Sequence, residues 1–89
     1  MYWDVTEVKV VNDRAIHVRF KDGLEGDVRF GANFFRGVFS HLTDPHRFRD
    51  VGVVGGVVTW PGELDIAPDR IHHDISVNGA CVLGGEAVV

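Results

Sequence analysis

The side chains with the clearest chemical potential are grouped histidines and acids near the end of the chain. His72, His73 and Asp74 are consecutive, and a second group lies within residues 41–46. Imidazole and carboxylate groups are common zinc ligands, but a helical zinc site needs histidines three or four residues apart. Adjacent helical residues point about 100° apart and rarely chelate one ion. A metal- or ligand-binding sensor using His72, His73 and Asp74 is therefore our alternative hypothesis, and solvated histidines near a helix end are the simpler interpretation.

Nucleophiles are scarce and poorly placed for catalysis. Ser40 and His41 are neighbours in the sequence, which does not give the geometry of a catalytic triad, and no Gly-x-Ser-x-Gly motif is present. The single cysteine, Cys81, is of the type that is usually a small buried thiol. The glycines match neither dinucleotide-binding nor P-loop spacing. We expect no enzymatic activity and no cofactor.

The charge balance argues against a nucleic-acid ligand. Nine Lys and Arg residues are outnumbered by 13 Asp and Glu residues, giving a net charge of -4, whereas phosphate binding needs clustered cations. No apolar run approaches the roughly 20 residues that span a bilayer. The N-terminus lacks the pattern of a signal peptide, and one cysteine cannot form an internal disulfide. We expect a cytoplasmic protein that binds neither nucleic acid nor membrane.

The elements that must position these residues belong to one small domain. Eighty-nine residues allow a single core, and a composition rich in valine and glycine favours strands and turns. We predict an α+β domain over residues 1–74, with a small antiparallel sheet of about five strands in two hairpins and two or three short helices. Residues 75–89 have no clear period and are predicted to be a C-terminal extension.

The first hairpin has a register that satisfies both of its faces. A three-residue turn at 21–23, with Gly23 in the left-handed conformation, puts Phe20 opposite Leu24. A β-bulge near residues 6–7 would restore the alternation of the preceding strand. The cross-strand pairs predicted for the hairpin are Ile16 with Val28, His17 with Asp27, Val18 with Gly26, and Arg19 with Glu25.

Proline and aromatic spacing mark the helices. Residues 34–42 have apolar side chains at helical intervals. Asp44 followed by Pro45 is a typical helix start, and this helix is predicted to end near Asp50. Residues 64–66 form a short edge strand, and a last helix begins at Pro68 and runs to about residue 74.

The second hairpin, residues 51–60, is apolar on both faces. Its glycine turn pairs Val53 with Val58. Two apolar faces indicate a central position in the sheet or a face covered by another chain. Tyr and Trp are enriched at interfaces, so the residues we expect to contact a partner come from this hairpin and the N-terminus. They are Trp3, Val54, Val57 and Trp60; the alternative is that all four belong to the domain's own core.

Several short strings occur in an order and spacing that resemble a known family. They are Trp3-Asp4-Val5, Phe20-Lys21-Asp22-Gly23, Gly37-Val38-Phe39, Leu42-Thr43-Asp44-Pro45, Phe48, Val57-Val58-Thr59-Trp60-Pro61 and Leu64-Asp65-Ile66-Ala67-Pro68-Asp69-Arg70-Ile71. The chain is similar to the small bacterial proteins classified as domain of unknown function 2442. The resemblance implies a compact α+β fold, no established activity and no agreed catalytic residues.

The resemblance also implies a type of partner. Many family members look like small proteins encoded beside another short protein, in arrangements that resemble toxin–antitoxin pairs. We therefore expect a non-catalytic protein-interaction module, the antitoxin-like or regulatory member of a two-protein system. Its expected partner is a protein encoded nearby or a second copy of the chain.

Overall fold

The computed structural model describes residues 3–31, 34, 40, 42–62 and 64–84. In this part of the chain the strands form two sheets, one ordered β1-β2-β3-β7 and one ordered β4-β5-β6. The α+β class is confirmed, but the single sheet of about five strands is wrong, because the two hairpins belong to different sheets. The elements are β1 (Val5–Asn12), β2 (Ala15–Phe20), β3 (Glu25–Phe30), α1 (Pro45–Phe48), β4 (Gly52–Val54), β5 (Val57–Trp60), β6 (Leu64–Ile66), α2 (Pro68–Asn78) and β7 (Ala80–Leu83).

The first hairpin, β2–β3, has the predicted register. All four predicted cross-strand pairs are present, and the amide of Phe20 donates to the carbonyl of Leu24 at 2.7 Å. Gly23 has a φ of 93°, the left-handed conformation that a three-residue turn needs. The bulge in β1 is also confirmed, since the pairing with β2 shifts between Val5 and Glu7.

Residues 75–83, predicted to be an extension, are part of the domain. The boundary predicted at residue 74 falls inside α2, which continues to Asn78. The chain then reverses at Gly79, which has a φ of 82°, and enters β7. This strand pairs in parallel with β3, with Val28 opposite Cys81. A parallel connection needs a crossover element, and α2 lies between the strands in the sequence.

The short helix α1 begins as the sequence indicates. The Asp44 side chain accepts a hydrogen bond from the His46 amide at 2.9 Å, and Pro45 occupies the first turn. The helix ends at Phe48, slightly earlier than predicted, and Phe48 is fully buried. Most of the apolar segment predicted at residues 34–42 lies outside the described residues.

The second hairpin, β4–β5, has Val53 opposite Val58 as predicted. Its turn contains Gly55 and Gly56, both with positive φ. The predicted edge strand at residues 64–66 is β6, and β5 is central in this three-stranded sheet.

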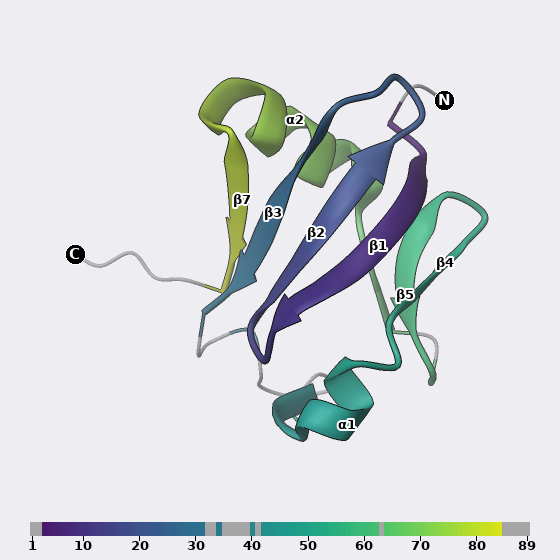
Figure 1. The fold of residues 1–89 in the computed structure, drawn as a ribbon, viewed down its shortest axis with the longest axis vertical. Helices are drawn as coiled ribbons and strands as arrows, with labels where there is room; N and C mark the ends of the chain where they lie inside the picture. Colours follow the sequence, from purple (N-terminus) through teal and green to yellow (C-terminus); the bar gives the residue numbers. More distant parts are fainter. Residues whose placement is uncertain (1–2, 32–33, 35–39, 41, 63, 85–89) are drawn as a thin grey trace.

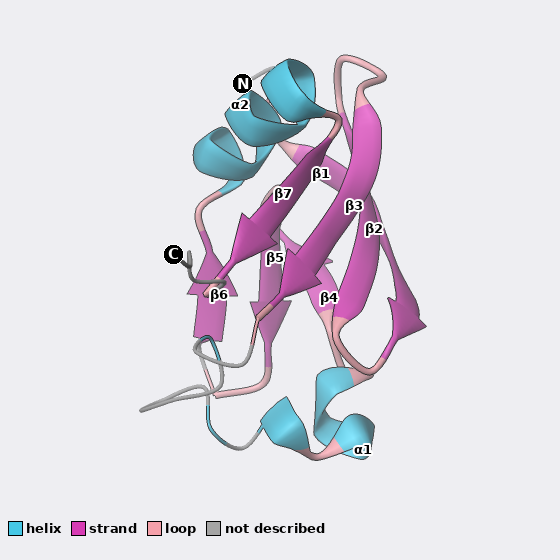
Figure 2. Ribbon diagram, turned by 90° about the vertical axis from the view of Figure 1, so that its left-hand side faces the viewer, coloured by secondary structure: helices cyan, strands magenta, loops and turns pink. Residues whose placement is uncertain are grey.

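The core lies between the two sheets (Figure 2). Phe30 from the first sheet, Phe48 from α1 and Trp60 from the second sheet pack together, with ring centroids 5.5–5.9 Å apart. The two helices lie at opposite ends of the sheets (Figure 2). Neither helix of the described chain has the length and apolar character to cross a membrane.

Candidate functional site

Residues 3–4 lie between two hairpin turns that are distant from them in the sequence, and we call this region the turn end. It comprises residues 3–4, the β2–β3 turn at 21–23 and the β4–β5 turn at 54–57 (Figure 1). Backbone hydrogen bonds join the segments. The Lys21 amide donates to the carbonyl of Asp4 at 2.8 Å, and the Val5 amide donates to the carbonyl of Gly56 at 2.9 Å.

The β4–β5 turn is held closely against the beginning of β1. A methyl group at Gly56 would lie 2.8 Å from the Asp4 carboxyl carbon, and the Gly56 φ is 82°. Glycine is therefore required here both by the backbone conformation and by the space. The close contact between Gly56 and Asp4 holds the turn that carries two valines. Of these, Val54 is 68% exposed, and Val57 is partly buried.

The turn end contains three of the four residues that we expected to contact a partner. Trp3 is partly buried and adjoins Asp4, the residue seated against the β4–β5 turn. Val54 and Val57 are paired across that turn. Sequence reasoning missed Lys21, whose amide donates to the Asp4 carbonyl, and Asp22, which contacts His72, because a hairpin turn gives no sign of the segments that it will contact.

Trp60, the fourth expected contact residue, lies in the core. None of its surface is exposed, and its indole N–H donates to the carbonyl of Phe48 at 2.9 Å. Successive side chains of a strand point to opposite faces. The face that carries Val58 and Trp60 is therefore inward, and the face that carries Val54 and Val57 is outward. The prediction that Trp60 contacts a partner disagrees with this placement.

The three groups of the alternative metal hypothesis have different surroundings. The His72 ring nitrogen Nε2 lies 2.7 Å from Asp22 Oδ2, which ties α2 to the turn end. Asp74 accepts from the Cys81 thiol at 3.4 Å, and His73 is exposed. Among the residues described, no group of three or more His, Cys, Asp and Glu side chains is placed to hold a metal ion.

Electrostatics at the turn end favour an ionised Asp22. The backbone amide of Leu24 donates to this carboxylate at 3.0 Å, and this hydrogen bond, with a second contribution from His72, lowers its pKa. The carboxylate therefore fixes the β2–β3 turn and holds α2 beside it.

The Cys81 thiol is a poor nucleophile at neutral pH. Burial, reinforced by the hydrogen bond to Asp74, raises the pKa of this thiol to about 12. A thiol with such a pKa is protonated at neutral pH, and the thiolate is the nucleophilic form.

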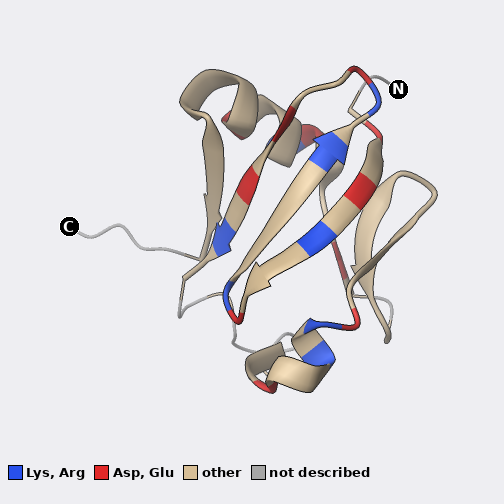
Figure 3. Ribbon diagram, in the orientation of Figure 1, with Lys and Arg blue, Asp and Glu red and all other residues tan. Residues whose placement is uncertain are grey.

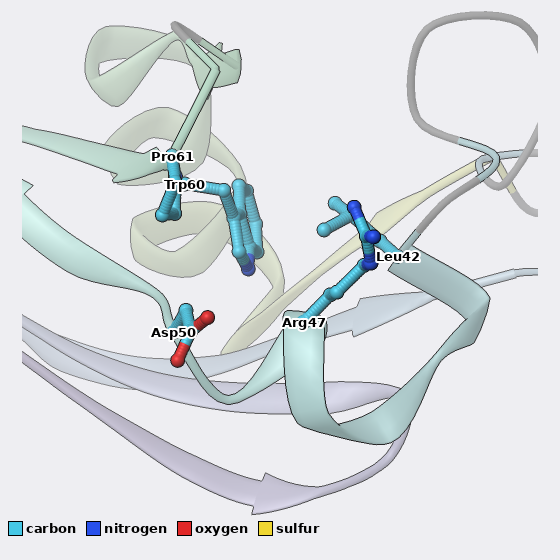
Figure 4. Close-up of a pocket in the computed structure, with 5 residues that line it drawn as sticks. All are labelled: Leu42, Arg47, Asp50, Trp60 and Pro61. Carbon is cyan, nitrogen blue, oxygen red and sulfur yellow. The ribbon is translucent and has the colours of Figure 1, made fainter.

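A cavity of about 320 Å³ lies at the opposite end of the β4–β5 hairpin, between α1 and the end of β5 (Figure 4). Arg47 and Asp50 line the α1 side, and Pro61 lines the other. Leu42 and Trp60 also border it, but both are almost fully covered. The accessible walls are thus two opposite charges and a proline, and sequence reasoning did not find them because neither charge has a recognisable spacing.

Comparison with known proteins identifies a family. No curated protein and no solved structure matches the chain. The model of the DUF2442 family, described as protein of unknown function, matches residues 5–76. This stretch runs from the first residue of β1 to within α2. The chain therefore belongs to the DUF2442 family.

Proposed function

We propose that the protein is a non-catalytic protein-interaction module that binds its partner through the turn end. The observation that carries the proposal is the exposure of Val54, 68%, on a turn that is held in place. A valine on a fixed backbone loses less conformational entropy on binding than a valine on a mobile loop. Burial of its side chain therefore contributes more to the affinity. The other apolar residues of the turn end are Val57, which is paired with Val54, and the partly buried Trp3. Lys21 and Asp22 are charged residues of its β2–β3 turn.

The surroundings of two candidate nucleophiles, Cys81 and Ser76, support the non-catalytic part of the proposal. The Cys81 thiol has a pKa of about 12 and no exposed surface. The Ser76 hydroxyl donates to the carbonyl of His73 at 2.8 Å within its own helix, where it is not activated by a base.

The partner we propose is the protein encoded next to this one, with the present chain as the antitoxin-like or regulatory member of the pair in the cytoplasm. Binding to a second copy of this chain is the other outcome that the experiment must distinguish from binding to a different protein. The metal- or ligand-sensor alternative has no comparable support, because His72, His73 and Asp74 are directed to different surroundings.

Co-expression of the chain with the product of the neighbouring open reading frame, followed by size-exclusion chromatography, tests the proposal. The two proteins are expected to co-elute, and Val54→Asp is expected to separate them. Val82→Asp is the matched control, because Val82 is also a strand valine and is 54% exposed, but lies on β7 away from the turn end (Figure 1).

Two results would contradict the proposal. If the wild-type proteins elute separately, the product of the neighbouring reading frame is not the partner. If the complex is lost with Val82→Asp but kept with Val54→Asp, the turn end is not the contact surface. Light scattering on the isolated chain at increasing concentration distinguishes self-association, since only that process raises the mass without the second protein.

A further inference from the structure

His17 is held between two carboxylates on the outer face of the four-stranded sheet. Its Nδ1 lies 2.7 Å from Asp27 Oδ1, and its Nε2 lies 2.8 Å from Glu25 Oε1. His17 is on β2 and both acids are on β3, where Asp27 is its direct cross-strand neighbour. One imidazole therefore bridges two alternate positions of the adjacent strand.

This geometry specifies the protonation state of the ring. An ionised carboxylate only accepts hydrogen bonds, so each ring nitrogen must donate an N–H. A neutral imidazole has one N–H and one lone pair, and the lone pair would face a carboxylate oxygen. Only the imidazolium form satisfies both contacts.

Other charged residues surround His17 on this face of the sheet. Lys9 on β1 is the cross-strand neighbour of His17, and Glu7 is that of Arg19. Arg19 in turn lies opposite Glu25 on β3, so acidic and basic residues are interspersed over β1, β2 and β3 (Figure 3). Arg29, two residues beyond Asp27 on β3, is exposed on the same face. With His17 protonated, four cations (Lys9, His17, Arg19 and Arg29) and three carboxylates lie on this surface, and loss of the proton lowers its net charge by one.

We propose that His17 is a proton-dependent clamp, which fastens β3 to β2 while it is protonated and lowers the net charge of this face by one when it loses the proton. The clamp is a regulatory device separate from the turn end. It makes any contact at the outer face of the sheet dependent on pH. Histidine suits this role because its charge changes near physiological pH.

The electrostatics of the cluster agree with this assignment. The hydrogen bond to Glu25, followed by the one to Asp27, raises the pKa of His17 above its ordinary value of 6.5, against a smaller opposing effect of burial. The same hydrogen bond lowers the pKa of Glu25, with Arg19 and Lys9 assisting. Each partner thus stabilises the charged form of the other.

Nuclear magnetic resonance of the imidazole ring tests the clamp directly. In the wild-type protein we expect both ring nitrogens of His17 to carry protons at neutral pH, and its titration midpoint to lie above 6.5. Glu25→Gln and Asp27→Asn should each lower the midpoint, because each removes a negative acceptor. The control is Glu7→Gln, which removes the same charge from the same face without touching the ring, and it should lower the midpoint less.

Two outcomes would overturn the proposal. One is a single-proton, neutral His17 in the folded protein at neutral pH. The other is a midpoint that Glu7→Gln lowers as much as Glu25→Gln and Asp27→Asn, which would assign the effect to net charge instead of the clamp. The wild-type measurement needs no variant, so the test holds even if a substitution disturbs folding.

Discussion

The two ends of the β4–β5 hairpin have opposite surroundings. At one end, Trp60 is fully buried, packs against Phe30 and Phe48, and donates its N–H to a backbone carbonyl. At the other end, Val54 is 68% exposed, although the turn beside it is bound to β1. The hairpin is thus anchored in the core at one end and presents apolar surface at the other.

The difference shows how one apolar hairpin can both stabilise the core and present a surface for binding. The inward face of β5, with Val58 and Trp60, is covered by the first sheet and α1. The outward face is less covered, since Val54 is 68% exposed and Val57 is only partly buried. Stability and binding are therefore expected to separate along the hairpin, and the following variants test that separation.

The largest effect is expected at the buried end. Trp60→Ala should lower the free energy of unfolding by about 3–5 kcal/mol, because it opens a cavity among aromatic rings. The Phe48 carbonyl also loses its donor. Urea denaturation followed by circular dichroism measures the change. A loss near 1 kcal/mol or less, typical of a surface substitution, would contradict the anchoring role.

An intermediate effect is expected at the glycine turn. Gly56→Ala should cost about 1–3 kcal/mol, since alanine at a positive φ is strained and its methyl group would meet Asp4 at 2.8 Å. Gly55→Ala is the matched control, because its φ is 59° but nothing lies within 4 Å of an added Cβ. Urea denaturation should show the larger loss for Gly56→Ala. Equal losses would mean that the contact with Asp4 does not hold the turn.

A small effect on stability is expected at the exposed end. Val54→Asp should change the free energy of unfolding by no more than about 0.5 kcal/mol, as surface substitutions usually do, while abolishing partner binding. The pair of variants Val54→Asp and Trp60→Ala thus separates the two roles of the hairpin. A strongly destabilised Val54→Asp protein would show that this end also supports the fold.

The smallest effect concerns a third region, the charged outer face of the first sheet. The folded-state pKa of His17 is raised above 6.5, so its contribution to stability is fully present below pH 6.5 and is lost as pH rises through the folded pKa. Urea denaturation of wild type and His17→Gln from pH 6 to pH 9 measures it. Wild type should lose more stability over this range than the variant. Parallel curves would show that the clamp has no energetic effect.

Local features of the fold could be predicted because neighbouring residues determine them. The register of β2–β3 follows from two faces that must both be satisfied, and only one turn length satisfies them. The start of α1 follows from Asp44 and Pro45, and the bulge in β1 follows from the change of parity between Val5 and Val8.

Long-range features could not be predicted in the same way. The first hairpin alternates between apolar and charged residues and the second is apolar on both faces, but neither pattern says whether two hairpins share a sheet or face each other. The strand β7 is short and follows a glycine, and its parallel pairing with β3 joins residues far apart in the sequence. For these reasons the two sheets and the inclusion of residues 75–83 appear only in the structure.

The candidate site was predicted only in part, because it also depends on long-range contacts. Val54, Val57 and Trp3 belong to one region because backbone hydrogen bonds join residues 4–5 to both turns, whereas the sequence indicates only that each is apolar. Trp60 shares a hairpin with Val54 but lies on the other face. Since both faces are apolar, the sequence does not identify the inward one.

The most direct test of the turn end as the contact surface uses the chain's two tryptophans. In Trp60→Phe, the remaining Trp3 reports on the turn end, and in Trp3→Phe the remaining Trp60 reports on the core. When the product of the neighbouring open reading frame is added, acrylamide should quench Trp3 less than before, and the quenching of Trp60 should stay unchanged. A complex that forms without any change in Trp3 would contradict the account.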